Sequence, residues 1–257
     1  MNPTLVRLPL SCVAAGALIA GPVALAQAPT PPPPTAVAPP PPPGAYTSMP
    51  LSRTQGTVRR FTLTPIGEID GIILADGTEI HLPPHLTAEI AAAVRTGDRV
   101  SVQGYRSPYL PLVVAASITD ADTGQTVVDT GPPPRGSRPP HPPPGMPAPG
   151  AQPASVFGKV QRTLYGPAED VNGAVLDNGT IVRIGPREAD RVAPLLAAGQ
   201  TLAVQGWRLA TPYGTVVAAQ AVGPSPGQLT QVAPPPPPGF AYAPPPAPGA
   251  PPPSPAR

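Results

Sequence analysis

Hydrophobic and polar residues alternate along residues 56–63 (GTVRRFTL), a pattern typical of a strand with one buried face. The next hydrophobic stretch, residues 71–82 (GIILADGTEIHL), is divided by Asp76 and Gly77. Gly accepts the positive φ of a two-residue turn, so an Asp-Gly pair between two apolar runs favours a β-hairpin. This part of the chain therefore predicts one strand followed by a hairpin of two more.

The hydrophobic period lengthens after Pro84, a residue suited to the first turn of a helix. The apolar positions that recur there are Leu86, Ile90 and Val94. They would share one face of a helix over about residues 85–95, which Gly97 is expected to end. Alternation returns in residues 99–106, and an apolar run follows in residues 111–118, so two final strands are predicted.

The same pattern occurs a second time, 102 positions later. Residues 158–208 match residues 56–106 without a gap, and 15 of the 51 positions are identical. A register held over this length favours duplication over shared composition. In the second copy Pro194 falls inside the expected helix and predicts a local distortion there. The chain thus contains two copies of one small domain.

Three strands, a helix and two strands are the order of the OB-fold, a partly open five-stranded barrel. The glycines and valines of the first copy carry this likeness: Gly56-x-Val58, Gly71 to Thr78, and Gly97-Asp98-x-Val100-x-Val102-x-Gly104. Each copy resembles the small OB-fold-like domains of bacterial periplasmic proteins. These motifs specify turns, so the resemblance implies a fold and no activity. We expect an all-β protein of two tandem barrels with one short helix each; the helix disfavours the alternative, an SH3-like barrel.

Proline accounts for 49 of the 257 residues and is concentrated outside the two copies. Because proline lacks a backbone donor and fixes φ, such runs favour disordered, extended spacers. The tracts could alternatively act as polyproline ligands, for which the tail PPPPPGFAYAPPP is best suited. The expected segments are a signal peptide 1–26, a Pro-rich segment 27–50, a first barrel domain 51–130, a Pro-rich linker 131–153, a second barrel domain 154–223 and a Pro-rich tail 224–257.

The first residues predict an exported protein. Arg7 precedes an apolar run, and the small residues Ala24 and Ala26 precede Gln27, a pattern that signal peptidase accepts. We expect cleavage after Ala26 and a periplasmic or secreted mature chain, which would then contain no cysteine. Two alternatives are a membrane anchor, disfavoured by the glycines and proline of the run, and a lipid on Cys12, disfavoured because the run continues past it.

The charge of the chain is almost balanced, with a formal net charge of +2. The first domain carries 6 Arg against 9 acidic residues, and the second carries 6 basic against 5 acidic residues. Arg59, Arg60 and Arg162 are interpreted as ordinary strand-face charges. Nucleic-acid-binding domains usually carry a dense basic footprint, so nucleic acid is predicted to be an unlikely partner.

Candidate catalytic and metal residues are few. His81 alternates with Glu79 along a predicted strand, which suggests a solvent-facing pair, and lone histidines seldom form a metal site. Asp70 and Asp76 lie around turns, where Asp bonds the local backbone. We find no nucleophile triad, phosphate loop or dinucleotide motif. The sequence therefore predicts no catalytic residue, no metal and no cofactor.

Two aromatic residues are the best candidates for ligand contact. Tyr105 and Trp207 occupy the same repeat position, and Arg106 and Arg208 follow them. They precede the loop between the fourth and fifth strands, which often binds ligand in OB-folds. An aromatic ring beside Arg can stack on a sugar, a base or a proline. The alternative is that both rings merely pack against the barrel.

The sequence predicts an exported, non-enzymatic envelope protein whose tandem barrels bind an envelope protein or a cell-wall glycan. An oligonucleotide-binding protein is the alternative. A hydrolase with an unrecognised site is a second alternative, for which no nucleophile stands out.

Overall fold

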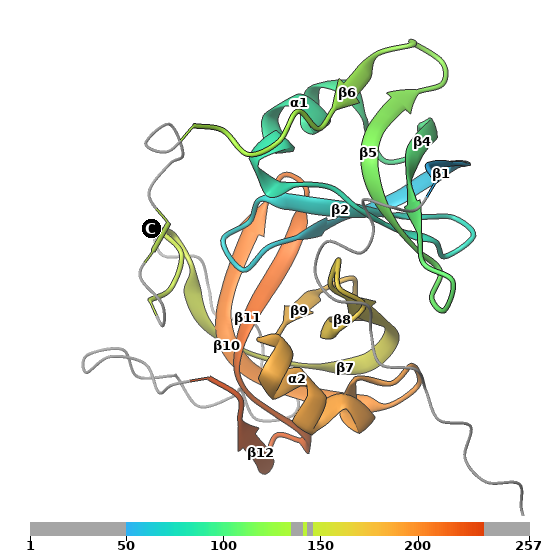
Figure 1. Ribbon diagram of the computed structural model, residues 1–257. Coiled ribbons are helices and arrows are strands. Elements are labelled where there is room, and N and C mark those ends of the chain that lie inside the picture. Colours follow the sequence, from blue (N-terminus) through green and yellow to red (C-terminus); the bar gives the residue numbers. More distant parts are fainter. Residues whose placement is uncertain (1–49, 135–140, 143–145, 234–257) are drawn as a thin grey trace, which may run out of the picture. The chain divides into compact units, whose positions relative to one another are not determined.

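The computed structural model describes residues 50–134, 141–142 and 146–233, and the predicted signal peptide lies outside this range. Two barrels follow one another along the chain (Figure 1). The first contains β1 (Ser52–Leu63), β2 (Ile69–Leu74), β3 (Glu79–His81), a 3₁₀ turn (Pro84–Leu86), α1 (Thr87–Ala93), β4 (Arg99–Arg106), β5 (Leu112–Asp120) and β6 (Thr126–Val128). The second contains β7 (Gln152–Tyr165), β8 (Val171–Leu176), β9 (Ile181–Arg183), α2 (Pro186–Val192), a 3₁₀ turn (Ala193–Leu196), β10 (Thr201–Thr211), β11 (Gly214–Ser225) and β12 (Gln228–Gln231).

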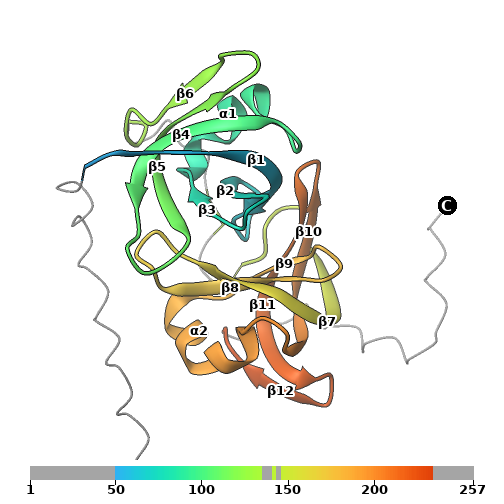
Figure 2. The same ribbon diagram turned by 90° about the vertical axis from the view of Figure 1, so that its right-hand side faces the viewer.

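Each barrel is a five-stranded sheet that closes on itself. In the first, the order β3-β2-β1-β4-β5 is antiparallel throughout and closes through a parallel pairing of β3 with β5. The second repeats this with β9-β8-β7-β10-β11 and a parallel β9–β11 pairing. Figure 2 shows both barrels from a second side. The all-β prediction of two barrels with one short helix each is confirmed, and the barrels are OB-like.

The observed elements differ from the predicted ones at their ends. Each barrel carries a sixth strand, β6 or β12, which pairs outside the closed part and was not predicted. The first helix is shorter than predicted, because its first turn is a 3₁₀ turn. In the second copy the helix ends at Val192 and a 3₁₀ turn containing Pro194 follows. This confirms the local distortion that was predicted at Pro194. No helix in the described part of the chain is long and apolar enough to span a membrane.

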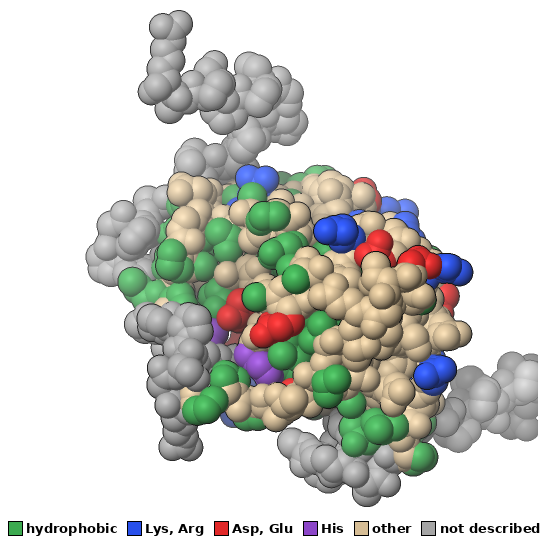
Figure 3. All heavy atoms as spheres, turned by 90° about the horizontal axis from the view of Figure 1, so that it is seen from above, with side chains coloured by type: hydrophobic (Ala, Val, Ile, Leu, Met, Phe, Trp, Pro, Cys, Tyr) green, Lys and Arg blue, Asp and Glu red, His purple; other side chains and the backbone are tan. Residues whose placement is uncertain are grey.

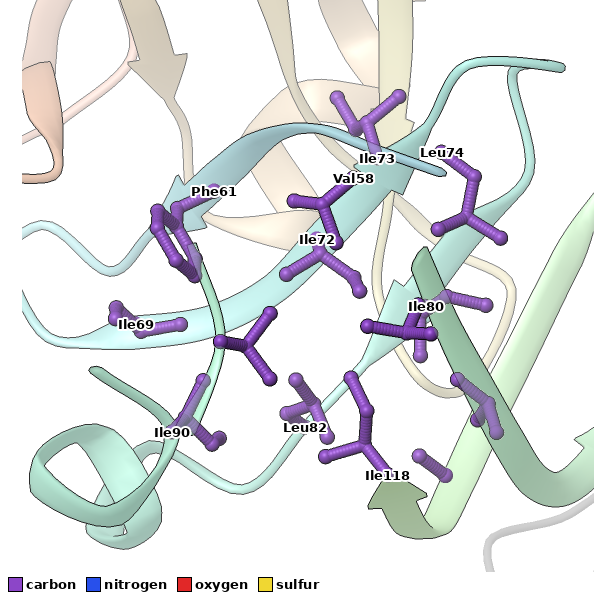
Figure 4. Close-up of a cluster of buried hydrophobic side chains, with 14 of the residues drawn as sticks. Val58, Phe61, Ile69, Ile72, Ile73, Leu74, Ile80, Leu82, Ile90 and Ile118 are labelled. Carbon is purple, nitrogen blue, oxygen red and sulfur yellow. The ribbon is translucent and has the colours of Figure 1, made fainter. Parts of the chain in front are cut away.

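The core of the first barrel is built from the apolar positions of its strands and helix. Figure 4 shows Ile72, Ile80 and Ile118 from the strands, with Ile90 from α1, all fully buried. This cluster does not stop at the barrel wall. It continues into four side chains of the second barrel, which are Leu164, Val175, Ile181 and Val216. The two barrels therefore share buried hydrophobic surface and pack as one body in this region.

Candidate functional site

Two arginines join the barrels through matching contacts. Arg60 on β1 donates from Nη1 to the carbonyl oxygen of Gly179 at 3.2 Å. Arg162 on β7 donates from Nη2 to the carbonyl oxygen of Gly77 at 2.7 Å. Arg60 and Arg162 are equivalent in the repeat, and so are Gly77 and Gly179. An interface in which each partner offers the same patch to the other is the hallmark of two-fold symmetry.

A second reciprocal pair lies deeper in the same interface. His81 on β3 hydrogen-bonds through Nε2 to the carbonyl oxygen of Tyr165 at 2.7 Å. Its repeat equivalent, Arg183 on β9, donates from Nε to the carbonyl oxygen of Leu63 at 2.8 Å. Leu63 and Tyr165 are again equivalent positions. The matching contacts come from the first three strands of each barrel. The β10–β11 hairpin of the second barrel adds Val216 to the shared core and Tyr213, whose ring centroid lies 5.8 Å from that of Phe61 in an edge-on contact.

This packing overturns the prediction that Glu79 and His81 face solvent. Their exposed fractions are only 1% and 6%. The alternation along β3 was read correctly as two faces, but the second barrel covers the face that was expected to meet water. Glu79 also lies beside the partner barrel, where its Oε2 accepts from the backbone N–H of Tyr165 at 3.4 Å.

Arg183 is the centre of a buried polar cluster. Its Nη2 donates to both carboxylate oxygens of Asp70, at 2.8 and 2.6 Å. Its Nη1 donates to Oδ1 of Asn172 at 2.6 Å. With the bond to Leu63, one guanidinium thus contacts both barrels, and only 4% of its side chain is exposed. A fork of donors on a rigid plane is well suited to such multiple contacts.

Burial changes the titration of the two groups on β3. Loss of water raises the pKa of Glu79 to about 7, although Arg183 and Arg162 favour its charged form. Burial lowers the pKa of His81, against the pull of Asp70. Both shifts disfavour charge in the interface, as expected where water is excluded. The cluster is structural, because its hydrogen bonds link the two barrels.

A basic groove opens at the place where the two arginines cross. The residues that line it are Arg59, Arg60, Ile73, Gln161 and Arg162, around about 130 Å³. Arg59 and Gln161 are equivalent positions, so the groove lies where the two copies meet. Sequence reasoning missed it because each arginine alone looks like an ordinary surface charge. The available signal was that Arg60 and Arg162 are identical at one repeat position.

The charges of this groove are not neutralised by carboxylates. None of its three arginines takes part in a salt bridge within the described ranges. Burial lowers the pKa of Arg60, and the charges of Arg59 and Arg162 lower it further. The acids of the nearby turns are bonded locally: Asp76 accepts from the backbone N–H and hydroxyl of Thr78. The groove therefore concentrates positive charge, and among the described residues no carboxylate forms an ion pair with its arginines, although Glu79 lies close enough for its charge to act on Arg162.

Toward the start of β7, two further side chains are exposed beyond the basic groove. Lys159 is exposed, and Phe157, two residues earlier, exposes 55% of its surface. Alternate residues of a strand share one side, so the cation and the ring lie next to one another. Figure 3 shows one face of the molecule, on which basic side chains lie among acidic and other polar ones. On β7, an exposed aromatic ring lies next to an exposed cation.

The four residues predicted to bind ligand are not gathered in this groove. Arg106 and Arg208 are exposed, and Arg106 donates from Nη2 to Oγ1 of Thr54 at 3.0 Å. Tyr105 is half-buried and Trp207 is buried, with 4% of its surface exposed. The ring of Trp207 lines a cavity with residues of the linker. A ligand could stack on this ring only by entering that cavity, so ligand contact at these positions stays a prediction.

The histidines do not belong to a larger ligand set. Nε2 of His85 lies 3.7 Å from Oδ1 of Asp129, and Nε2 of His81 lies 3.7 Å from Oε1 of Glu79. Over the described ranges, no group of three or more His, Cys, Asp or Glu residues could hold a metal ion.

No protein-family model matches the sequence, and no curated protein is similar to it. Solved structures that are similar to parts of the chain include two of one protein. One is the wild-type single-stranded DNA binding protein from Thermus aquaticus, with 14% identity, 67% of this chain and 91% of that chain covered, and a TM-score of 0.21. The other is a deletion mutant of the same protein, with 15% identity, 74% and 97% coverage, and a TM-score of 0.22.

These matches correct one prediction. Nucleic acid was expected to be an unlikely partner, and that expectation is contradicted because both similar structures are of a single-stranded DNA binding protein. The physical reason is that net charge averages over the surface and hides a local cluster such as the basic groove. At these TM-scores the matches carry no further argument, and the function is argued from the basic groove itself.

Proposed function

We propose that the protein binds single-stranded nucleic acid without catalysis, with the phosphate backbone in the basic groove. The observation that carries the proposal is that the two barrels bring three arginines, Arg59, Arg60 and Arg162, into one groove, where none of them forms an ion pair with a described residue. Arginine can donate two parallel bonds to a phosphate, so a groove of three arginines suits the charge of a nucleic-acid backbone.

The exposed ring of Phe157 favours single-stranded nucleic acid over a simple anion as the ligand. Proteins that bind single strands combine a positive groove with aromatic rings on which bases stack. Phe157 and Lys159 lie on β7 beyond the groove and would take the nucleotides that follow the bound phosphates. Bases that are paired in a duplex cannot stack on such a ring, so the ligand is a single strand.

The predicted export and the predicted protein or glycan partner remain predictions. If the signal peptide is cleaved after Ala26, the ligand would be nucleic acid outside the cytoplasm. No specific contact in the described residues favours a glycan or protein partner over a polyanion at this groove.

The test is fluorescence anisotropy of a labelled oligothymidylate of about 16 nucleotides, the upper site size for one OB-fold. Binding is measured over a series of salt concentrations. Arg59→Ala should lower the slope of log K against log salt by about 0.7, the effect of one lost phosphate contact on a single strand. Phe157→Ala should weaken binding by about 1–3 kcal/mol, the value of one stacked base.

Arg191→Ala is the matched control, because this exposed arginine of α2 lies outside the groove. It should change neither quantity. Polyphosphate of similar length separates a strand from a general polyanion, since Phe157→Ala should leave polyphosphate binding unchanged. Absence of oligonucleotide binding at low salt, or equal losses in the Arg191→Ala and Arg59→Ala proteins, would refute the proposal.

A further inference from the structure

A second cavity shares no lining residue with the basic groove and has a different chemistry. It encloses about 220 Å³ and is lined mainly by apolar side chains. The lining residues are Pro65, Ile66, Met146, Pro147, Ala148, Gly185, Trp207, Ala218, Ala219, Gln220 and Ala233. An aromatic ring in an apolar groove with few polar groups is how proteins recognise polyproline II segments.

One wall of this cavity already consists of a proline-containing segment. Pro147 and the buried Ala148, at the end of the Pro-rich linker, line it together with Trp207. Extended proline-containing chain therefore packs beside this ring in the protein itself.

Gln220 supplies an unused polar group at this place. The residue is 6% exposed, and its Oε1 is buried without a hydrogen-bond partner among the described residues. A buried polar atom without a partner costs free energy unless a ligand satisfies it. A half-turn of the side-chain amide would present its N–H at the same point. Proline carbonyls accept such a donor, and a proline run has no backbone N–H of its own.

The position of the cavity along the chain indicates which segment binds in it. Ala233 is both the last described residue and part of the cavity wall. Five prolines, Pro234–Pro238, follow it directly. A segment tethered at the edge of its site has a high effective concentration there and needs little intrinsic affinity. We propose that this cavity is a polyproline-binding site, and that the proline run 234–238 of the tail occupies it.

The single tryptophan of the chain makes the proposal testable in the full-length protein, because Trp207 is the only residue of its type. Its emission is recorded with selective excitation, and its accessibility is measured by acrylamide quenching. Changing all five residues of the run 234–238 to Ala should raise the quenching constant several-fold and shift the emission to longer wavelength. The change lies beyond the last strand, so the far-ultraviolet circular dichroism should stay the same, while the thermal unfolding temperature should fall slightly because the folded state loses a bound segment.

The chain offers a matched control, since residues 39–43 are also five prolines followed by Gly. The same five changes there should leave Trp207 unaffected. A synthetic peptide of residues 233–246, added to the tail variant, should restore the protected emission in a saturable manner. Gln220→Leu in the full chain should weaken that protection.

Equal quenching of the wild-type protein and the tail variant overturns the proposal. An effect of the N-terminal changes as large as that of the tail changes also overturns it, because the occupant would then not be the tail. A peptide that protects Trp207 in trans when the tail changes have no effect in cis would mean that the cavity takes a proline-rich segment from elsewhere, which likewise contradicts the assignment.

Discussion

Replacing Glu79 by Gln should remove a pH dependence of stability that the barrel interface creates. The carboxyl group has a pKa of about 7 in the folded protein and an ordinary value of 4.5 when exposed. Between those values the folded chain holds a proton that the unfolded chain has released. Linkage then requires that stability falls as pH rises from 4.5 to 7, and that the loss is complete above pH 7.

The size of the effect follows from the shift. Each unit of pKa difference corresponds to about 1.4 kcal/mol, so Glu79 should cost the wild-type protein about 2–3 kcal/mol between pH 5 and pH 8. Glu79→Gln keeps an oxygen for the N–H of Tyr165 and carries no charge at any pH. It should be more stable than the wild-type protein at pH 8 by about the same 2–3 kcal/mol. The second copy has Ile181 at this position, which is buried and uncharged.

The assay is urea unfolding followed by circular dichroism at pH 5 and at pH 8. The quantity of interest is the difference in unfolding free energy between the two proteins at each pH, which cancels groups that titrate in both. His81 contributes in the opposite direction, because burial lowers its pKa, and its Nε2 lies only 3.7 Å from Oε1 of Glu79. The same comparison in a His81→Gln background therefore removes its contribution. If the unfolding free energies of the two proteins change in parallel from pH 5 to pH 8, burial does not raise the pKa of Glu79 and the reasoning is wrong.

Three further substitutions test the packing by the same urea assay. Arg183→Met should cost about 3–5 kcal/mol, because it leaves the partly buried carboxylate of Asp70 without its cation; a cost below about 1 kcal/mol, the value of a surface pair, would contradict this. Gly104→Ala should cost about 1–3 kcal/mol, because the added Cβ would lie 2.3 Å from the carbonyl oxygen of Val114, a backbone atom that cannot turn away. Arg99→Ala should change the unfolding free energy by less than about 1 kcal/mol, since its ion pair with Asp122 is exposed, and a larger loss would show an unrecognised role.

Local patterns were sufficient to predict the barrels. The turn at Asp76-Gly77 is present with Gly77 at a φ of 90°, and Gly97 adopts a φ of 100°, values that favour glycine. The sixth strands escaped prediction because the run that forms β6 is only Thr126–Val128. Its position is set by Asp120, whose carboxylate accepts from the backbone N–H groups of Asp122 and Thr123 and turns the chain back.

Much less of the candidate site could be predicted from the sequence. Trp207 stood out as a rare residue type, yet rarity does not tell which side of a barrel wall the ring occupies, and the ring is buried. Arg60 and Arg162 look like surface charges in each copy taken alone. Only when the copies pack do their guanidinium groups approach each other, across carbonyl oxygens of the opposite barrel.

The sequence by itself determined the two barrels, their shared strand order and their turns, because these depend on residues that are close in the chain. How the two copies pack on one another, through the first three strands of each and the β10–β11 hairpin of the second, is seen only in the folded protein. That contact brings Arg183 to Leu63 and places the groove arginines together, although more than a hundred residues separate the partners. Hydrophobic alternation shows that a strand has two faces, but it does not show whether water or a second barrel covers the polar one. For Glu79 and His81 the second barrel covers it, and their burial, their shifted pKa values and the basic groove all follow from that packing.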